Sequence, residues 1–169
     1  MILREKHINF IELGKRILGA KPSMMKSKSD TGVVVTKSTR EEIDYVHSSI
    51  LKFNAEQVPL TQKDPFIYLN YIVKDGKKVL GGVKAVMYNW KMLFINVLWV
   101  NANYQHQGYG SALMKRVEEE ARKMGSTLAH VDTFDFQAKD FYIKNGYEIF
   151  GVLKDCPPGH ERYYLKKPL

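Results

Sequence analysis

A nearly unbroken apolar run at residues 92–100 is the feature that most limits how this chain can fold. The run is well short of the roughly 20 residues that a membrane-spanning helix needs, and an all-apolar strand is expected where both faces of a sheet are covered. A polar loop at 101–107 follows, and a helical pattern begins near Gly108. An apolar strand that leads through a glycine-containing loop into a helix predicts an α/β sheet with at least one helix packed on it.

The segments around this run predict the remaining elements of a mixed fold. A β-branched segment at 33–35 predicts a first strand, and Ser38 or Thr39 is placed to cap the helix that follows. Asp75-Gly76 predicts the type I′ turn of a β-hairpin, because both central positions of that turn take positive φ. The other elements are expected as strands at 66–73, 79–88, 128–133, 147–153 and 162–166 and as helices at 110–124 and 137–144.

Residues 1–30 are expected to form a separate N-terminal extension, an amphipathic helix and a polar linker, ahead of a main domain at 31–169. Apolar residues recur at roughly helical spacing as far as Leu18, and Gly19 and Pro22 then stop the pattern. Such a helix packs on its own domain or on a partner chain. An amphipathic helix lying on a membrane surface is the alternative.

The composition limits the class of protein and its surroundings. The 169 residues suffice for one compact domain, and the single cysteine excludes an intrachain disulfide and a thiolate zinc cluster. No apolar run of about 18 residues and no apolar signal region is present, so we expect a cytoplasmic protein without a membrane partner. The net charge of +8 favours anionic ligands, but the basic residues form no aromatic-interleaved stripe, so nucleic acid is not the expected partner.

The loop at 101–107 and the helix start after it form a candidate anion site. The first N–H groups of a helix have no intrahelical acceptor, and with the positive end of the helix dipole they suit a diphosphate. Gly108 and Gly110 let phosphate oxygens approach the bare backbone, and Gln105 is placed to brace the loop. A Walker A loop is excluded because no Gly-Lys-Ser/Thr follows, and Leu113 occupies the third glycine position of a dinucleotide fingerprint. An acyl-coenzyme A site is the remaining option.

Two motifs of this chain resemble those of the GNAT superfamily of N-acetyltransferases. Gln105-x-x-Gly108-x-Gly110 is similar to motif A of that family, Arg/Gln-x-x-Gly-x-Gly/Ala after the fourth strand. The resemblance covers most of the chain, from residue 33 to residue 167, and includes the order of the elements. The match to motif B is Ala138-x-x-Phe141-Tyr142-x-Lys144-x-Gly146-Tyr147.

The resemblance implies a fold and a reaction. The fold would be α/β (α+β), with a mixed, mostly antiparallel central sheet of about seven strands flanked by helices, plus the extra N-terminal helix. The fourth and fifth strands, 92–100 and 128–133, would splay apart to admit the pantetheine arm of acetyl-coenzyme A (acetyl-CoA). The implied reaction is transfer of the acetyl group of acetyl-CoA to a primary amine by direct attack, without a metal ion.

The resemblance also assigns residues to the site. Backbone groups of Leu98 and Val100 would pair with the pantetheine arm, and Tyr142 would protonate the departing thiolate as the catalytic acid. Asp135 stands where many relatives have asparagine; its carboxylate would cap the next helix but could not donate a hydrogen bond to the pantetheine. The residues implied in acetyl-CoA binding are Leu98, Trp99, Val100, Gln105, His106, Gln107, Gly108, Tyr109, Gly110, Ser111, Ala138 and Tyr142.

The amine must lose a proton before it attacks, and the sequence leaves the base open. His130, Asp132, Asp135 and Asn96 all lie near the expected site by sequence position. A non-catalytic acyl-CoA-binding module of the same fold is the alternative function, and nucleic-acid binding is a second alternative that rests on the charge alone. Exposed strand edges and the N-terminal helix are compatible with a homodimer.

Overall fold

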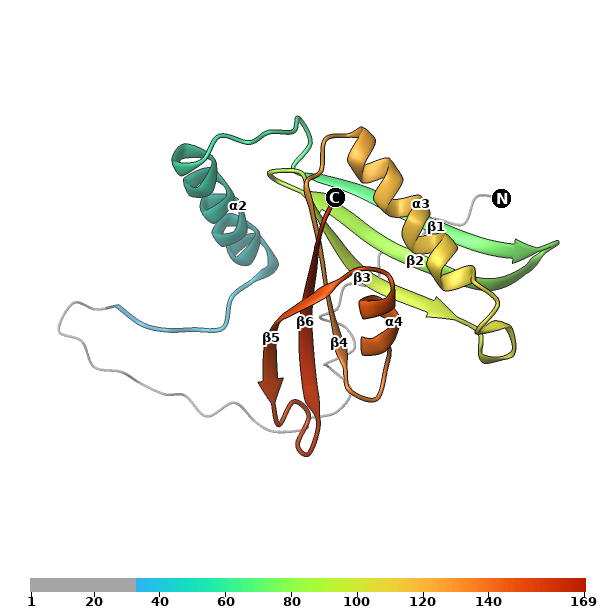
Figure 1. The fold of residues 1–169 in the computed structure, drawn as a ribbon. Coiled ribbons are helices and arrows are strands. Elements are labelled where there is room, and N and C mark those ends of the chain that lie inside the picture. The colour runs from blue at the N-terminus through green and yellow to red at the C-terminus, as the bar shows by residue number, and fades with distance from the viewer. Residues whose placement is uncertain (1–32) are drawn as a thin grey trace. The chain divides into compact units, whose positions relative to one another are not determined.

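The computed structural model describes residues 33–169 (Figure 1). The helix and linker expected at residues 1–30 lie outside the described residues. The chain divides into two compact units, Met1–Ile50 and Leu51–Leu169, with the boundary inside helix α2 (Arg40–Gln57). No helix among the described residues is long and apolar enough to cross a membrane.

Helix α2 begins with a cap at Thr39, one of the two residues the sequence predicted, and the cap is reciprocal. The hydroxyl of Thr39 accepts a hydrogen bond from the backbone N–H of Glu42 at 3.2 Å, and the Glu42 carboxylate accepts one from the Thr39 N–H at 2.7 Å. The strand predicted at 33–35 is wrong: these residues have no regular secondary structure, and Val33, Val34 and Val35 are 65%, 74% and 87% exposed. A β-branched run forms a strand only where a neighbouring strand takes up its backbone groups.

The second unit contains a single six-stranded sheet in the order β1-β2-β3-β4-β6-β5. Every neighbouring pair is antiparallel except β3 and β4, which are parallel, so the expected mixed, mostly antiparallel sheet is confirmed with six strands among the described residues. The strands are β1 (Phe66–Asp75), β2 (Lys78–Tyr88), β3 (Met92–Val100), β4 (Leu128–Phe134), β5 (Glu148–Lys154) and β6 (Glu161–Pro168). The helical elements are η2 (Ala102–Tyr104), α3 (Tyr109–Lys123) and α4 (Lys139–Lys144).

The hairpin between β1 and β2 differs from the expected turn. The paired residues are Asp75 and Lys78, so the loop consists of Gly76 and Lys77. Only Gly76 has a positive φ, of 54°. A glycine with positive φ at the first central position is the pattern of a type II′ turn, and the predicted type I′ turn over Asp75-Gly76 is therefore wrong.

Helix α3 packs on β1, β2 and β3 and provides much of the core. Figure 1 shows how the helix runs across the sheet. Its apolar stripe recurs every three to four residues, as expected for a helix that buries one face. Gly125, with φ 85°, ends it as predicted. Its buried apolar residues are Leu113, Met114, Val117 and Ala121, and they join Leu93, Ile95, Ala129, Val131, Tyr142 and Leu165 in one cluster.

Strands β3 and β4 pair along only part of their length. The parallel ladder joins Met92–Ile95 to Leu128–Val131, which we call the closed half. A bulge follows: Ala85 of β2 is opposite Ile95 and Lys84 is opposite Val97, which leaves Asn96 as the extra residue. Beyond Asn96, residues 97–100 pair only with β2 and residues 132–134 pair only with β6. We call residues 96–100 and 132–134 the open half. The predicted splaying of these two strands is confirmed.

Candidate active site

The loop that leaves β3 is held by side-chain hydrogen bonds at its start. The side-chain oxygen of Asn101 accepts a hydrogen bond from the Asn103 N–H at 3.0 Å and so caps η2. The side-chain amide of Gln105 donates to the Val100 carbonyl at 3.1 Å, across the turn. Gln105 therefore braces the loop, as the sequence suggested, and occupies one backbone group at the end of β3.

Two residues of the loop have positive φ, and they frame the start of α3. His106 has φ 60° and Gly108 has φ 84°, with Gln107 between them. Alternation of left-handed and right-handed backbone makes successive N–H groups converge on one point, a geometry that binds anions. A left-handed non-glycine residue such as His106 is uncommon and is found at functional loops more often than elsewhere.

The two glycines of the loop serve different purposes. A Cβ added to Gly108 would meet no heavy atom within 4 Å, so open space lies beside the backbone there. A Cβ added to Gly110 would come within 3.1 Å of the Phe141 ring of α4. Gly108 thus provides a positive φ and room for a ligand, whereas Gly110 lets α3 and α4 approach each other.

Gly108 is the N-cap of α3, and the first helical hydrogen bond runs from the Ala112 N–H to the Gly108 carbonyl at 2.9 Å. The N–H groups of Tyr109, Gly110 and Ser111 come before that bond and have no intrahelical acceptor. They lie next to the open space at Gly108. A diphosphate fits this donor set, because the N–H groups and the helix dipole both favour negative charge.

The open half of β3 directs its side chains to both faces of the sheet. Leu98 and Val100 are partly buried and pack against the core, whereas Trp99 is 54% exposed on the opposite face. Between 96 and 100 the edge of β3 away from β2 has no partner strand among the described residues. An extended ligand could therefore pair with the backbone along this edge.

Tyr142 lies on α4 and is 5% exposed. Its ring contacts the rings of Phe141 and Tyr147 at centroid distances of 5.2 and 5.8 Å, and its hydroxyl has no hydrogen-bond partner among the described residues. Burial, with a contribution from the charge of Asp132, raises the pKa of Tyr142 to about 12. The hydroxyl is therefore neutral at physiological pH and is a weaker acid than a free phenol.

Tyr147, which the sequence placed in motif B without a role of its own, is a buried tyrosine whose hydroxyl is hydrogen-bonded. It donates to the Glu118 carboxylate at 3.1 Å, and Lys167 donates to the other oxygen of that carboxylate at 2.7 Å. Glu118 is 3% exposed and also pairs with Arg122. The Glu118–Arg122 spacing was visible in the sequence, but the contacts to β6 and Tyr147 require the fold.

A second polar group lies on the face of the sheet opposite the core. The Tyr88 hydroxyl and the His130 Nε2 are 2.9 Å apart, and the His130 ring stacks on Phe94 at 4.8 Å between centroids. Burial lowers the pKa of His130, although the charge of Asp132 opposes this, and burial raises the pKa of Tyr88. Both groups are therefore neutral near pH 7.

The two aspartates named as candidate bases are both engaged. Asp132 accepts two hydrogen bonds from the Arg162 guanidinium, one of them from Nε at 2.7 Å. Asp135 accepts from the Phe136 N–H at 2.8 Å and is 3.1 Å from His160 Nδ1. The expectation that Asp135 caps α4 is wrong, since Ala138 is the N-cap and has no side-chain cap. Instead, the side-chain oxygen of Gln137 accepts the Phe134 N–H at 3.1 Å and holds this turn.

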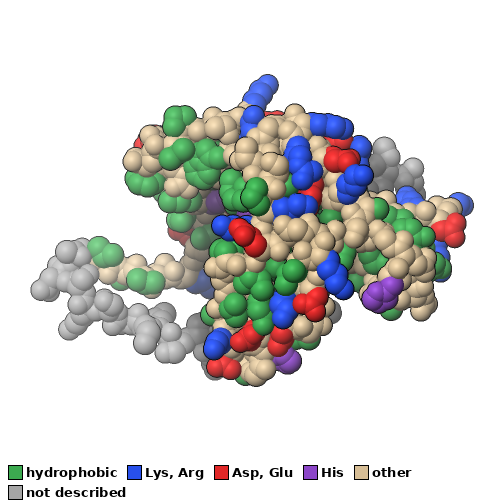
Figure 2. Space-filling view, viewed as in Figure 1, with side chains coloured by type: hydrophobic (Ala, Val, Ile, Leu, Met, Phe, Trp, Pro, Cys, Tyr) green, Lys and Arg blue, Asp and Glu red, His purple; other side chains and the backbone are tan. Residues whose placement is uncertain are grey.

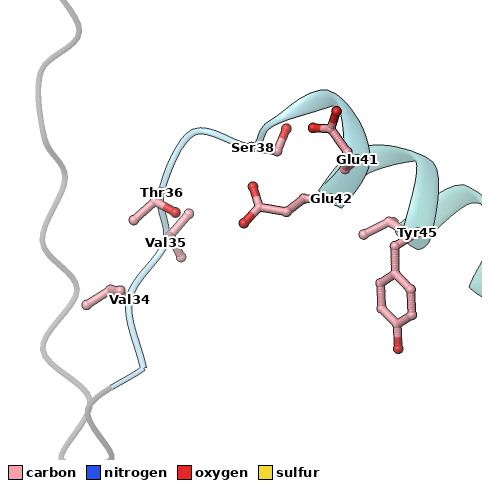
Figure 3. A pocket seen from close by; sticks show the side chains of 8 residues that line it. Val34, Val35, Thr36, Ser38, Glu41, Glu42 and Tyr45 are labelled. Atoms are coloured by element: carbon pink, nitrogen blue, oxygen red, sulfur yellow. The ribbon is translucent and has the colours of Figure 1, made fainter.

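A hollow of about 660 Å³ lies in the N-terminal unit and contains none of the predicted site residues. Its lining comes from the extended segment at Val34–Thr36 and the first turns of α2, where Glu41 and Glu42 point from the helix start (Figure 3). The lining residues are exposed, and no chemistry-bearing cluster accompanies them. Among residues 33–169, no group of three metal-ligating side chains is present.

The structure brings most of the predicted site residues into one region of the second unit. Residues 105–111 form the loop and the first turn of α3, and residues 98–100 form the open half of β3 that leads into it. Phe141 links this loop to α4, which carries Ala138 and Tyr142 at its start and middle. Trp99 is the exception, because its side chain faces away from the core that holds Tyr142.

A sheet that opens beside a glycine loop and a helix start has the fold of the acetyltransferase class. A family model described as the Acetyltransferase (GNAT) family matches residues 36–147, and the chain belongs to this family. A Blasticidin-S acetyltransferase of Streptomyces morookaense is 33% identical over 115 residues, which are 67% of this chain and 84% of that protein. An acetyltransferase of Agrobacterium fabrum (strain C58) is 32% identical over 101 residues, 59% of this chain and 72% of that protein.

Solved structures agree with the family assignment. The crystal structure of an acetyltransferase from Bacillus cereus ATCC 14579 matches with a TM-score of 0.75 and 35% identity, over 80% of this chain and 96% of that chain. A Bacillus anthracis protein assigned as a streptothricin acetyltransferase was solved in complex with acetyl coenzyme A. It matches with a TM-score of 0.55 and 18% identity over 64% of this chain and 65% of that chain, and it supports the fold.

Proposed function

We propose that this protein transfers the acetyl group of acetyl-CoA to a primary amine. The observation that carries the proposal is the meeting of three features: the edge of β3 that has no partner strand among the described residues, the loop with open space at Gly108, and the hydroxyl of the largely buried Tyr142, which has no hydrogen-bond partner among the described residues. The first would pair with the pantetheine arm, the second would hold the diphosphate, and the third would face the sulfur. Family membership supports the reaction class.

The reaction is a direct displacement at the thioester carbonyl. The neutral amine nitrogen attacks the carbonyl carbon, and a C–N bond forms while the oxygen takes on negative charge. Collapse of this intermediate breaks the C–S bond, and the Tyr142 hydroxyl gives its proton to the departing thiolate. Tyr142 also argues against the non-catalytic alternative, because a binding module has no use for a tyrosine hydroxyl that has no hydrogen-bond partner among the described residues.

Blasticidin S is the first acceptor to test, because the 33% identical relative is named for it. Acidic side chains at the expected acceptor side suit a cationic amine: Glu56 and Asp64 before β1, Asp155 between β5 and β6, and Glu161 at the start of β6. Several of these carboxylates are already partnered within the chain, so they would act mainly through long-range attraction. On the face shown in Figure 2, acidic and basic side chains mix over the position of α3, and no continuous basic stripe for a nucleic acid is seen there.

The test is calorimetric titration of the purified protein with acetyl-CoA, followed by a thiol-release assay with blasticidin S and with spermidine. We expect a Kd on the order of micromolar for the wild type, which corresponds to about −8 kcal/mol. Gly108→Glu should abolish binding, because it places a carboxylate where the diphosphate would lie. Gly108→Ala is the matched control, since it introduces the same left-handed strain without the charge. No binding by the wild type would overturn the proposal.

A further inference from the structure

Three side chains form an aromatic and imidazole cluster on the face of the sheet opposite the core. His130 of β4 stacks on Phe94 of β3 with an interplanar angle of 19°, and it lies nearly perpendicular to the Tyr88 ring of β2, with an interplanar angle of 84°. The Tyr88 hydroxyl lies 2.9 Å from Nε2 of the imidazole. All three are half-buried, so they are held in place but remain within reach of a ligand.

The cluster lies next to the point where β3 and β4 part. His130 is opposite Phe94, and the next pair, Ile95 with Val131, is the last before the strands part. The side chain of His130 points away from the face that holds Ala129, Val131 and the core around Tyr142. The acid and the imidazole therefore approach the opening from opposite faces of the sheet.

The other candidate bases near the opening are occupied or chemically unsuited. Asp132 is paired with Arg162, and Asp135 is held by His160 and the Phe136 N–H. Asn96 is an amide and accepts no proton near neutral pH. His130, by contrast, makes its one hydrogen bond among the described residues to a neutral phenol.

The groups that face His130 leave the imidazole uncharged. Tyr88 faces it from β2, Asp132 follows it on its own strand, and Lys166 is its register partner on β6. Lys166 pairs with Glu148 of β5 at 3.3 Å, so its charge is balanced locally. Partial burial lowers the pKa of His130, which keeps a proton acceptor available at pH 7.

We propose that Tyr88 and His130 together remove the proton from the acceptor ammonium, an inference that rests on the proposed function. The ammonium N–H bond breaks as its proton moves to Tyr88 Oη, and the phenolic proton moves to His130 Nε2. The products of this step are a neutral amine, a neutral phenol and an imidazolium. The imidazolium then returns its proton to water, and the amine lone pair is free to attack the thioester.

The test compares His130→Gln and Tyr88→Phe with the wild type, with blasticidin S and spermidine as the amine probes. Tyr68→Phe is the matched control, because Tyr68 of β1 is 64% exposed and lies outside the cluster. We expect kcat/KM at pH 7 to fall about 100-fold in both cluster variants, the lower end of what a general base contributes. The control should keep wild-type activity. Acetyl-CoA affinity by calorimetry and the unfolding midpoint should change little in all three.

The pH profile separates a base from a merely structural residue. The wild type should lose kcat/KM as the pH falls through the pKa of His130, which burial holds below the ordinary value for histidine. His130→Gln should lack that limb and recover toward wild-type rates as the pH rises toward 10, because the amine then loses its proton to water. Cluster variants that fold, bind acetyl-CoA and keep the wild-type profile would overturn the inference alone. Absence of acetyl-CoA binding in the wild type would instead overturn the proposed function, and the inference with it.

Discussion

The closed and open halves of the β3–β4 pair are built from the same two strands and differ in one residue. In the closed half, Leu93 and Ile95 pack in the core at 0% and 1% exposure, and every ladder position is paired. After the bulge at Asn96, β3 keeps its partner β2 but no longer reaches β4. Burial and pairing in the closed half stabilise the fold, whereas the unpartnered edge in the open half is free for a substrate. A single extra residue thus separates the stabilising part of the pair from the reactive part.

Deletion of Asn96 should have the largest effect, because it removes that separation. With one residue fewer, Ile95 and Leu98 would still face the core, so the alternation of faces would be preserved and the ladder could continue past Val131. We expect acetyl-CoA affinity to fall at least about 100-fold, or about 2.7 kcal/mol, with little loss of stability. Calorimetry and urea unfolding measure the two quantities. Asn96→Ser keeps the bulge and is the control; a deletion variant that binds normally would contradict the comparison.

Truncation in the closed half should affect stability instead. Ile95→Ala removes a fully buried side chain, and we expect the free energy of unfolding to fall by about 3 kcal/mol. Val97→Ala in the open half removes a side chain that is 44% exposed, and its cost should be below about 0.5 kcal/mol. Urea unfolding of both variants checks this. Equal losses would show that the two halves do not differ in their contribution to folding.

The two buried tyrosines sharpen the same comparison. Tyr142→Phe removes a hydroxyl with no partner among the described residues, so kcat should fall about 100-fold while the unfolding midpoint stays unchanged. Tyr147→Phe takes a donor from the buried Glu118, and we expect a loss of about 2 kcal/mol of stability with kcat unchanged. Steady-state kinetics and urea unfolding of both variants are needed. A Tyr142→Phe variant that is less stable but fully active would assign Tyr142 to the core.

The smallest predicted effect is the pH dependence of stability through His130. The pKa of His130 is lowered in the folded state, so the unfolded chain binds more protons as the pH falls below about 6.5. The stability that the neutral imidazole contributes is therefore present above that pH and is lost as the pH falls toward the folded-state pKa. The difference in unfolding free energy between wild type and His130→Gln should shrink between pH 7 and pH 5. A constant difference would contradict the lowered pKa.

Local patterns predicted the elements well and their tertiary partners less well. The cap at Thr39 and Glu42 and the end of α3 at Gly125 follow from neighbours within four residues, and both were predictable. The isolated valines at 33–35 and the turn at Gly76-Lys77 were predicted wrongly, because strand formation and turn type depend on the register of a second segment. Likewise, Gln137 rather than Asp135 holds the turn before α4, which depends on where β4 ends.

The sequence by itself determined the order of the elements, the glycine loop after β3 and the membership of the family, because periodicity, glycine positions and motif spacing are all local properties. Only the tertiary structure decided that Asn96 is the bulge, that Tyr88 lies against His130 from 42 positions away, and that Glu118 is buried beneath Lys167. These contacts depend on how distant strands align and on which side of each strand faces the core. No window of neighbouring residues contains that information, since a shift of one residue in register exchanges the two faces.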